Sequence, residues 1–239
     1  MKNLSRPLGI ALLVTAASAA TSPAFADWTG KGQAGAVIST GNSESKAGNV
    51  KLALGETTGP WTHTVGFNAV YASDSASTTS QRWELLGQTN YKFDAHNFVF
   101  GGLRYEDDRF GGYKSQATLS GGIGHQFLDT ADTKLSGQVG LGYKRTEQRN
   151  PAETVSALAY LGALDYRHTF NASTTLLDKL SVEATSDNTY AQNELALEVK
   201  MSDKLALAVG YAVRYNSAPP PAFRKTDTLT TVNLVYQIK

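Results

Sequence analysis

The sequence contains no cysteine, little proline and no excess of charge of either sign. Without cysteine, a disulfide framework, a thiol nucleophile and a cysteine-ligated zinc site are all excluded. The 22 lysines and arginines nearly balance the 21 aspartates and glutamates, so no basic surplus exists to neutralise nucleic-acid phosphates. No apolar run reaches the roughly 20 residues that a membrane-spanning helix needs. Nucleic-acid-binding proteins and helical membrane proteins are therefore excluded.

The first 26 residues have the features of a secretory signal peptide. Lys2 and Arg6 supply a positive start, residues 8–20 form a short apolar stretch, and Ala24-Phe25-Ala26 is a small-x-small cleavage site. We expect cleavage after the last of these residues, which leaves 27–239 as one exported domain.

Beyond this leader, bulky apolar side chains alternate with small or polar ones. In residues 205–215 the odd positions are Leu, Leu, Val, Tyr, Val and Tyr, and the even positions are Ala, Ala, Gly, Ala and Arg. Such alternation is typical of a strand whose two faces meet different surroundings. Twelve segments of this kind are predicted, at residues 28–39, 45–56, 61–72, 81–92, 97–105, 113–127, 134–145, 154–168, 175–185, 190–200, 205–215 and 227–238.

The lengths of these segments and their connectors favour a membrane barrel. Most segments have roughly the 9–11 residues of a tilted membrane-crossing strand. Short connectors alternate with mostly longer ones, which are residues 73–80, 106–112, 146–153 and 216–226. Short periplasmic turns and longer extracellular loops are typical of outer-membrane barrels. All five prolines beyond the leader lie in connectors, as expected where every strand donates to neighbours on both sides.

We therefore predict an all-β protein, a transmembrane antiparallel up-and-down β-barrel of about twelve strands in the outer membrane of a Gram-negative bacterium. The bulky face would contact lipid and lipopolysaccharide, and the small and polar face would line the lumen. The barrel assembly machinery is then an expected partner. A soluble periplasmic β-protein is the alternative fold. Its two-sheet interior would need large side chains, whereas the second face here is small and polar.

One connector and the inferred lumen hold the candidate site residues. The connector cluster could bind a divalent cation or bridge lipopolysaccharide phosphates, or it could be a solvated loop whose charges pair with each other; it consists of Glu106, Asp107, Asp108 and Arg109. The lumen charges could form a constriction with weak charge selectivity or a salt-bridged plug that closes the barrel; they are Lys51, Arg82, Glu84, Lys114, Lys144, Asp165, Arg167, Glu183, Glu194 and Arg214.

No pattern in the sequence predicts catalysis or a cofactor. The four histidines are His63, His96, His125 and His168, and all are expected near the periplasmic ends of strands rather than beside an acidic partner at the extracellular rim. No Gly-x-Ser-x-Gly, His-Glu-x-x-His or Walker sequence occurs. The glycines of Gly121–Gly124, with three more in the next segment, predict tight bending or the close approach of an inward side chain.

The segment Arg104–Gly111 and the glycine-rich strand that follows it resemble the YdiY-like family of salt-induced outer-membrane proteins. Ser39-Thr40-Gly41-Asn42 is similar to an early Ser-x-Gly-Asn feature of that family. The resemblance implies an outer-membrane β-barrel with a role in envelope, salt or osmotic stress, and it brings no catalytic residues. Three functions follow as hypotheses: a passive small-solute channel, a surface adhesin or receptor, and a barrel hydrolase.

Overall fold

The computed structural model describes residues 29–40, 45–73, 78–149, 151–219 and 223–238. The predicted leader and its cleavage site, and Gly41 and Asn42 of the early feature, lie outside the described residues. Among those described, no helix is long and apolar enough to cross a membrane. The strands are β1 (Thr29–Thr40), β2 (Ser45–Thr58), β3 (Trp61–Ser73), β4 (Thr78–Lys92), β5 (Asn97–Asp108), β6 (Tyr113–Asp129), β7 (Thr133–Gln148), β8 (Thr154–Thr169), β9 (Thr174–Ala184), β10 (Thr189–Lys200), β11 (Leu205–Asn216) and β12 (Thr226–Ile238).

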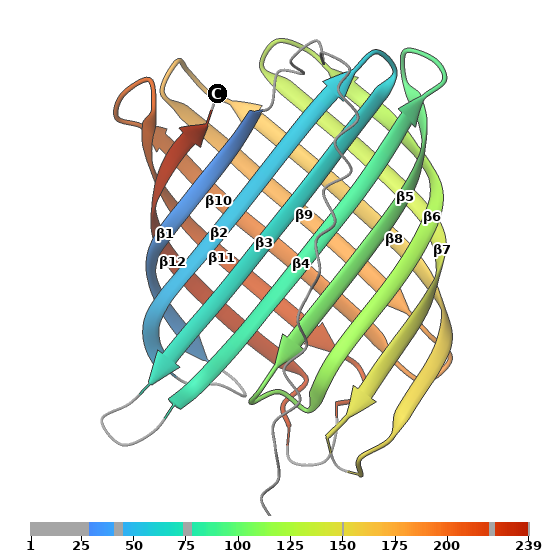
Figure 1. The fold of residues 1–239 in the computed structure, drawn as a ribbon. Helices are drawn as coiled ribbons and strands as arrows, with labels where there is room; N and C mark the ends of the chain where they lie inside the picture. Colours follow the sequence, from blue (N-terminus) through green and yellow to red (C-terminus); the bar gives the residue numbers. More distant parts are fainter. Residues whose placement is uncertain (1–28, 41–44, 74–77, 150, 220–222, 239) are drawn as a thin grey trace, which may run out of the picture.

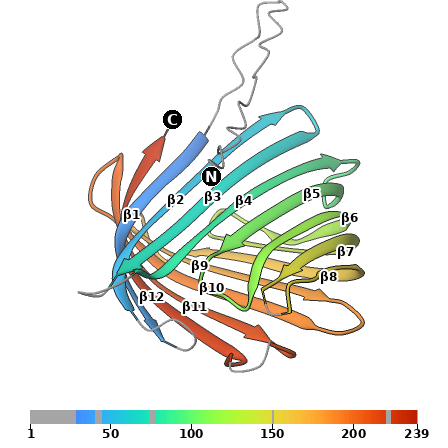
Figure 2. The same ribbon diagram turned by 60° about the horizontal axis from the view of Figure 1, so that its bottom comes forward.

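Every strand pairs antiparallel with its neighbours in the sequence, and the first strand pairs with the last. The β1–β12 register runs from Gly30 opposite Ile238 to Thr40 opposite Thr228. The sheet is thus a closed barrel, seen as a continuous tilted wall in Figure 1 and obliquely, with the lower end brought forward, in Figure 2. Closure pairs both edges of every strand, so no strand presents an open edge. The predicted twelve-stranded antiparallel barrel is confirmed.

The two ends of the barrel differ less than the sequence suggested. We call the end where β1 begins and β12 finishes the terminal end (the upper end in Figure 1), and the opposite end the loop end. At the loop end, the connectors expected at 106–112 and 146–153 shrink to 109–112 and 149–153, because the flanking strands continue into them. The longest expected connector, 216–226, shortens by one residue at each end to 217–225, between β11 and β12.

Large apolar side chains cover the outside of the barrel, and polar side chains fill its inside. On neighbouring strands, Leu119 is 64% exposed and Val139 is 60% exposed, while Lys144 and Glu84 are buried. The same alternation holds along β11, where Ala206 and Ala208 pack inside against Val235 of β12. This distribution is the reverse of a water-soluble protein, in which large apolar groups are the ones buried.

Two phenylalanines are an exception to the polar lumen. Phe98 and Phe100 of β5 point inward and are buried. A Cβ atom added at Gly124 would lie 2.1 Å from Cζ of Phe98, and one added at Gly122 or Gly140 would lie within 3 Å of the Phe100 ring. The predicted close approach of an inward side chain to the glycine-rich strands is therefore confirmed.

Side-chain hydrogen bonds fix the turn between β4 and β5 at the terminal end. Asp94 Oδ1 accepts from the backbone N–H groups of His96 (2.8 Å) and Asn97 (2.6 Å), and its Oδ2 accepts from Asn97 Nδ2 (2.7 Å). These hydrogen bonds hold the pKa of Asp94 below its ordinary value, and the bond from the Asn97 side chain has the largest effect. The previous turn uses Gly59, whose φ of 56° is in the left-handed region that favours glycine.

Candidate functional site

Six charged side chains form a layer across the lumen, which we call the charged belt. They come from four strands, and each side chain is between 5% and 14% exposed. The alternation that turns bulky residues outward turns these residues inward. The belt consists of Arg82 and Glu84 of β4, Arg104 and Glu106 of β5, Lys144 of β7 and Glu183 of β9.

Within β4 and β5, two arginines and two glutamates alternate around one another. Arg104 Nε lies 2.7 Å from Glu84 Oε1, and its Nη2 donates to Glu106 Oε2. Arg82 lies 3.6 Å from each of the two carboxylates, which is too long for a hydrogen bond. Arg104 is therefore the hydrogen-bonded centre of this group, whereas Arg82 interacts with the two carboxylates as an ion pair without hydrogen bonds to them.

Glu183 connects this group to the opposite wall. Its Oε1 lies 3.7 Å from Arg104 Nη1, and its Oε2 accepts from Lys144 Nζ at 2.8 Å. β9 pairs with neither β5 nor β7, so both ion pairs run through the lumen rather than along the wall. The ring of Tyr190 packs against the same cations, with its centroid 5.4 Å from Arg104 Cζ and 5.6 Å from Lys144 Nζ.

Further contacts also cross the lumen between strands that do not pair. Lys51 of β2 donates to Glu194 of β10 at 3.0 Å. Lys31 of β1 lies 2.7 Å from Glu198 of β10. Gln88 of β4 donates to Gln138 of β7 at 3.1 Å. Side chains thus bridge the interior at several points, and the charged belt is the most heavily buried of these bridges.

Several buried polar atoms in the lumen have no hydrogen-bond partner in the part of the chain that the structure describes. They belong to inward-facing side chains at and around the belt, namely Asn49, Arg82, Arg104, Thr118 and Asn233. Leaving such a group unpaired costs about 1–3 kcal/mol. Water is the partner that the lumen of a barrel can offer to these donors and acceptors.

Towards the terminal end, the lumen is wide enough to leave an ion pair exposed. Asp165 and Lys179, opposite each other on β8 and β9, lie 3.0 Å apart, and their side chains are 51% and 63% exposed. Both lie at the alternate strand positions that face inward, as Glu183 does. Arg167, two residues along β8, is also exposed. We call this region the vestibule.

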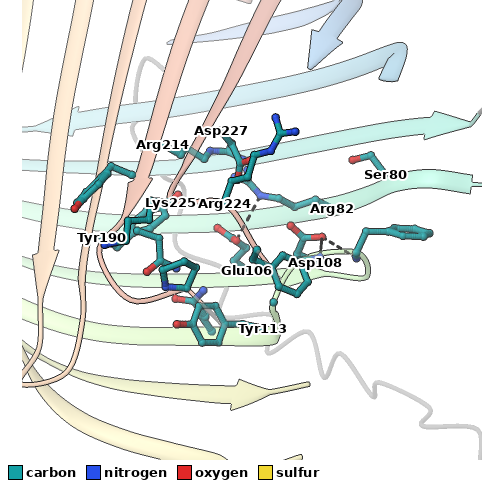
Figure 3. A pocket seen from close by; sticks show the side chains of 18 of the residues that line it. Ser80, Arg82, Glu106, Asp108, Tyr113, Tyr190, Arg214, Arg224, Lys225 and Asp227 are labelled. Atoms are coloured by element: carbon teal, nitrogen blue, oxygen red, sulfur yellow. Dashed lines mark hydrogen bonds and ion pairs between the residues drawn. The ribbon is translucent and has the colours of Figure 1, made fainter. Parts of the chain in front are cut away.

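At the loop end, a cavity of about 130 Å³ opens beside the belt (Figure 3). Four cationic side chains and three carboxylates line it, namely Arg82, Arg214, Arg224, Lys225, Glu106, Asp108 and Asp227. A second cavity of about 20 Å³ shares Arg82 and Arg214 with it and reaches Lys51 and Glu194. We call the larger space the mouth cavity.

The structure divides nine of the ten predicted lumen charges between three places. Arg82, Glu84, Lys144 and Glu183 lie in the belt, Lys51, Glu194 and Arg214 lie beside it, and Asp165 and Arg167 lie in the vestibule. Lys114 lies apart from these residues, at an irregularity near the start of β6, where its Nζ contacts Glu147 Oε1 at 2.8 Å. Both of these side chains are largely exposed, because the extra residue carries Lys114 out of the regular alternation.

The predicted connector cluster does not stay together. β5 continues to Asp108, so Glu106 joins the belt and Asp107 pairs opposite Trp83 on the outer face. Asp108 accepts from the backbone N–H groups of Phe110 and Gly111, and Arg109 donates to Gln81 Oε1 at 3.1 Å. Among the described residues there is no group of three or more His, Asp or Glu that could hold a metal ion.

The sequence reasoning missed three residues of the lumen. Arg104 lies in the predicted segment 97–105 but is not among the predicted lumen charges, although it alternates in step with Phe98 and Phe100 and therefore lies inside. Lys31 and Tyr190 were not considered as lumen residues, although Lys31 bonds Glu198 and Tyr190 packs in the belt. Alternation along β1, β5 and β10 was the signal that could have found them.

Three of the histidines face outward near the terminal end. Nδ1 of His63 lies 3.0 Å from Thr89 Oγ1, that of His125 lies 2.7 Å from Asn97 Oδ1, and that of His168 lies 2.8 Å from Thr133 Oγ1. The rings also contact aromatic neighbours, as His168 does with Phe170 at 4.7 Å between centroids. Each of these Nδ1 atoms thus has an uncharged partner rather than the carboxylate that a catalytic histidine would need.

The closed barrel with its polar lumen defines a protein of the outer-membrane β-barrel class. Its fold is similar to that of the NanC porin, with a TM-score of 0.59 at 10% identity over 88% of this chain and all of that one. It is also similar to the KdgM porin solved in complex with disordered oligogalacturonate, with a TM-score of 0.51 at 12% identity over 88% of this chain and 99% of that one.

The chain belongs to the family described as "Protein of unknown function, DUF481", whose model matches residues 32–238. It is 29% identical over 212 residues to the "Uncharacterized protein YdiY" of Escherichia coli strain K12, an alignment that covers 86% of this chain and 81% of that protein. The resemblance to YdiY-like proteins that the sequence indicated is confirmed.

Proposed function

We propose that the protein is exported through its leader and spans the outer membrane, with its terminal end in the periplasm. The apolar outer surface, on which Leu119 and Val139 are more than half exposed, is far larger than a soluble monomer normally leaves in water. Acyl chains would cover it without leaving a backbone group unpaired. Lipid, lipopolysaccharide and the barrel assembly machinery are the partners that this location implies.

We further propose that the barrel is a narrow conduit for small solutes. The observation that carries this proposal is the polar and charged lining of the lumen, which extends from the mouth cavity across the charged belt to the vestibule. A dry plug would leave the unpaired atoms of Arg82, Arg104 and Asn49 without partners, whereas a hydrated passage supplies them. That NanC and KdgM are porins of similar fold supports the same function.

The charged belt would set the size limit and the selectivity of this conduit. Glu183 bridges Arg104 and Lys144 from the opposite wall, so a solute must pass between or displace these ion pairs. Rings of fixed charge at a constriction select small ions and solutes by charge and size. We therefore expect small conductance steps rather than the large ones of an open porin.

The test is single-channel recording in planar bilayers with a double substitution that preserves net charge. Arg104→Ala with Glu183→Ala removes the bridge, and we expect a conductance several-fold above that of the unaltered protein. The matched control is Asp165→Ala with Lys179→Ala, which removes an exposed vestibule pair and leaves the conductance unchanged. If the unaltered protein and the Arg104/Glu183 variant are both folded and both silent, the conduit is rejected.

The role in salt or osmotic stress stays a prediction that rests on family resemblance. It predicts that cells lacking the protein grow as well as the parent strain at low salt and more slowly at high salt. Equal growth of the two strains at both salt concentrations would count against it. We propose no catalytic role, because the outward histidines bond uncharged partners.

A further inference from the structure

The guanidinium of Arg82 is buried, charged and incompletely bonded. The residue is 7% exposed, and its Nε and Nη1 have no hydrogen-bond partner among the described residues. Its two carboxylate neighbours, on Glu84 and Glu106, lie at 3.6 Å. Arg82 nevertheless lines both the mouth cavity and the smaller cavity beside it, and Figure 3 shows it next to Glu106 within that lining. A planar fork of unused N–H donors beside a cavity is suited to bind a carboxylate.

The other charges of the mouth cavity favour an anion over a cation. Its four cationic side chains outnumber its three carboxylates. Glu106 already bonds Arg104, and Asp108 already accepts two backbone N–H groups. Much of the acceptor capacity of these two carboxylates is therefore used within the protein. Arg214 reaches the same cavity, and its Nε is bonded to the uncharged Gln192 at 3.1 Å.

The size and apolar lining of the cavity fit a single six-membered ring. Its volume of about 130 Å³ is close to the roughly 150 Å³ of an engineered cavity that admits benzene. Phe110 and Tyr113 supply aromatic surface in the lining. Tyr113 is held in place by the hydrogen bond from its hydroxyl to the carbonyl of Ala218 at 3.3 Å. Aromatic walls with a few converging polar groups are typical of small-molecule sites.

We propose that the mouth cavity binds a small ring compound that bears a carboxylate, of the uronic-acid sugar type. The carboxylate binds the guanidinium groups of Arg82 and Arg214, and the ring lies against Phe110 and Tyr113. This inference rests on the proposed function, since the cavity would then be the entrance at which the conduit selects its solute.

The experiment is isothermal titration calorimetry on the folded, detergent-solubilised protein with glucuronate, glucose and acetate as probes. Glucuronate combines ring and carboxylate, whereas glucose lacks the charge and acetate lacks the ring. We expect glucuronate to bind with a Kd at least tenfold lower than either of the others. Arg214→Gln, at the less buried of the two arginines, should raise that Kd at least tenfold. Arg167→Gln, which removes an arginine from the distant vestibule, should leave it unchanged.

Three results would overturn the assignment: equal binding of glucuronate and glucose, equal binding of glucuronate and acetate, or unchanged glucuronate binding by Arg214→Gln. Arg82→Gln should abolish binding, and Arg214→Gln keeps the test decisive if the Arg82 variant does not fold. The calorimetry is independent of conductance. Selective binding by a protein that is silent in bilayers would reject the conduit and keep the site, and conductance without binding would reject only the site.

Discussion

Replacing Gly124 with alanine tests the packing of an aromatic ring inside the lumen. The new Cβ would lie 2.1 Å from Cζ of Phe98 and 2.4 Å from its Cε2, far inside van der Waals contact. Because Phe98 is buried and held between strands, we expect the ring or the backbone to shift. Overpacking of this kind typically costs about 1–3 kcal/mol, and we expect the unfolding free energy of Gly124→Ala to fall by about 2 kcal/mol.

The control and the compensating variant come from the same pair of strands. At Gly101 of β5, an added Cβ meets nothing within 4 Å, so Gly101→Ala should change the unfolding free energy by less than about 0.5 kcal/mol. Phe98→Leu removes the ring, so Gly124→Ala should cost much less in that background, which is a coupling of about 1 kcal/mol or more. Urea titrations followed by tryptophan fluorescence in detergent measure the unaltered protein, the three single variants and the double variant. Equal losses in Gly124→Ala and Gly101→Ala, or additive effects with Phe98→Leu, would refute the packing.

Two further predictions concern a buried pair and a turn. Lys144→Met removes one partner of the buried Glu183, and we expect the unfolding free energy to fall by about 3 kcal/mol. The control is Lys134→Met, at an exposed pair with Asp129, which should lower it by at most about 1 kcal/mol. Similar losses for the two variants in urea titrations would contradict the burial of the belt. The pKa of Asp94 is lowered in the folded protein, so its carboxylate stabilises the fold above the unfolded value of about 4, and that contribution is lost as the pH falls through the lower folded value. The stability difference from Asp94→Asn should therefore shrink between pH 5 and pH 2, and a difference independent of pH would refute it.

The fold was predictable from the sequence because successive side chains of a strand point to opposite faces. Where one face meets lipid and the other a polar lumen, apolar and polar or small residues therefore alternate with a period of two. In β11 the alternation of bulky and small residues alone assigns Leu207 to the outside and Ala208 to the inside, and both assignments hold. The end of β5 was harder to predict. The sequence pattern predicts a solvated loop at Glu106, Asp107 and Asp108, because three consecutive carboxylates are unusual in a strand. In this barrel every second residue of a strand faces a polar lumen, which accommodates the carboxylates at those positions.

The partners across the lumen could not be predicted from the sequence. Alternation places Lys51 and Glu194 on the inner face, but whether they meet depends on the register of every strand between β2 and β10. The same holds for Glu183 and Arg104, which lie 79 positions apart in the numbering and come together only when the barrel closes. Local patterns carry no information on the stagger that closure imposes.

Single cysteine substitutions test the orientation of the strands most directly, since the chain has no cysteine of its own. Gln138 and Val139 are neighbours on β7, the first bonded to Gln88 inside the lumen and the second 60% exposed on the outer face. In liposomes, a charged, water-soluble thiol reagent should modify Gln138→Cys but not Val139→Cys. A fluorophore at position 139 should be quenched by lipid-attached quenchers, and one at 138 should not. The opposite pattern, or equal labelling of both, would contradict a water-filled interior enclosed by an apolar, lipid-facing wall.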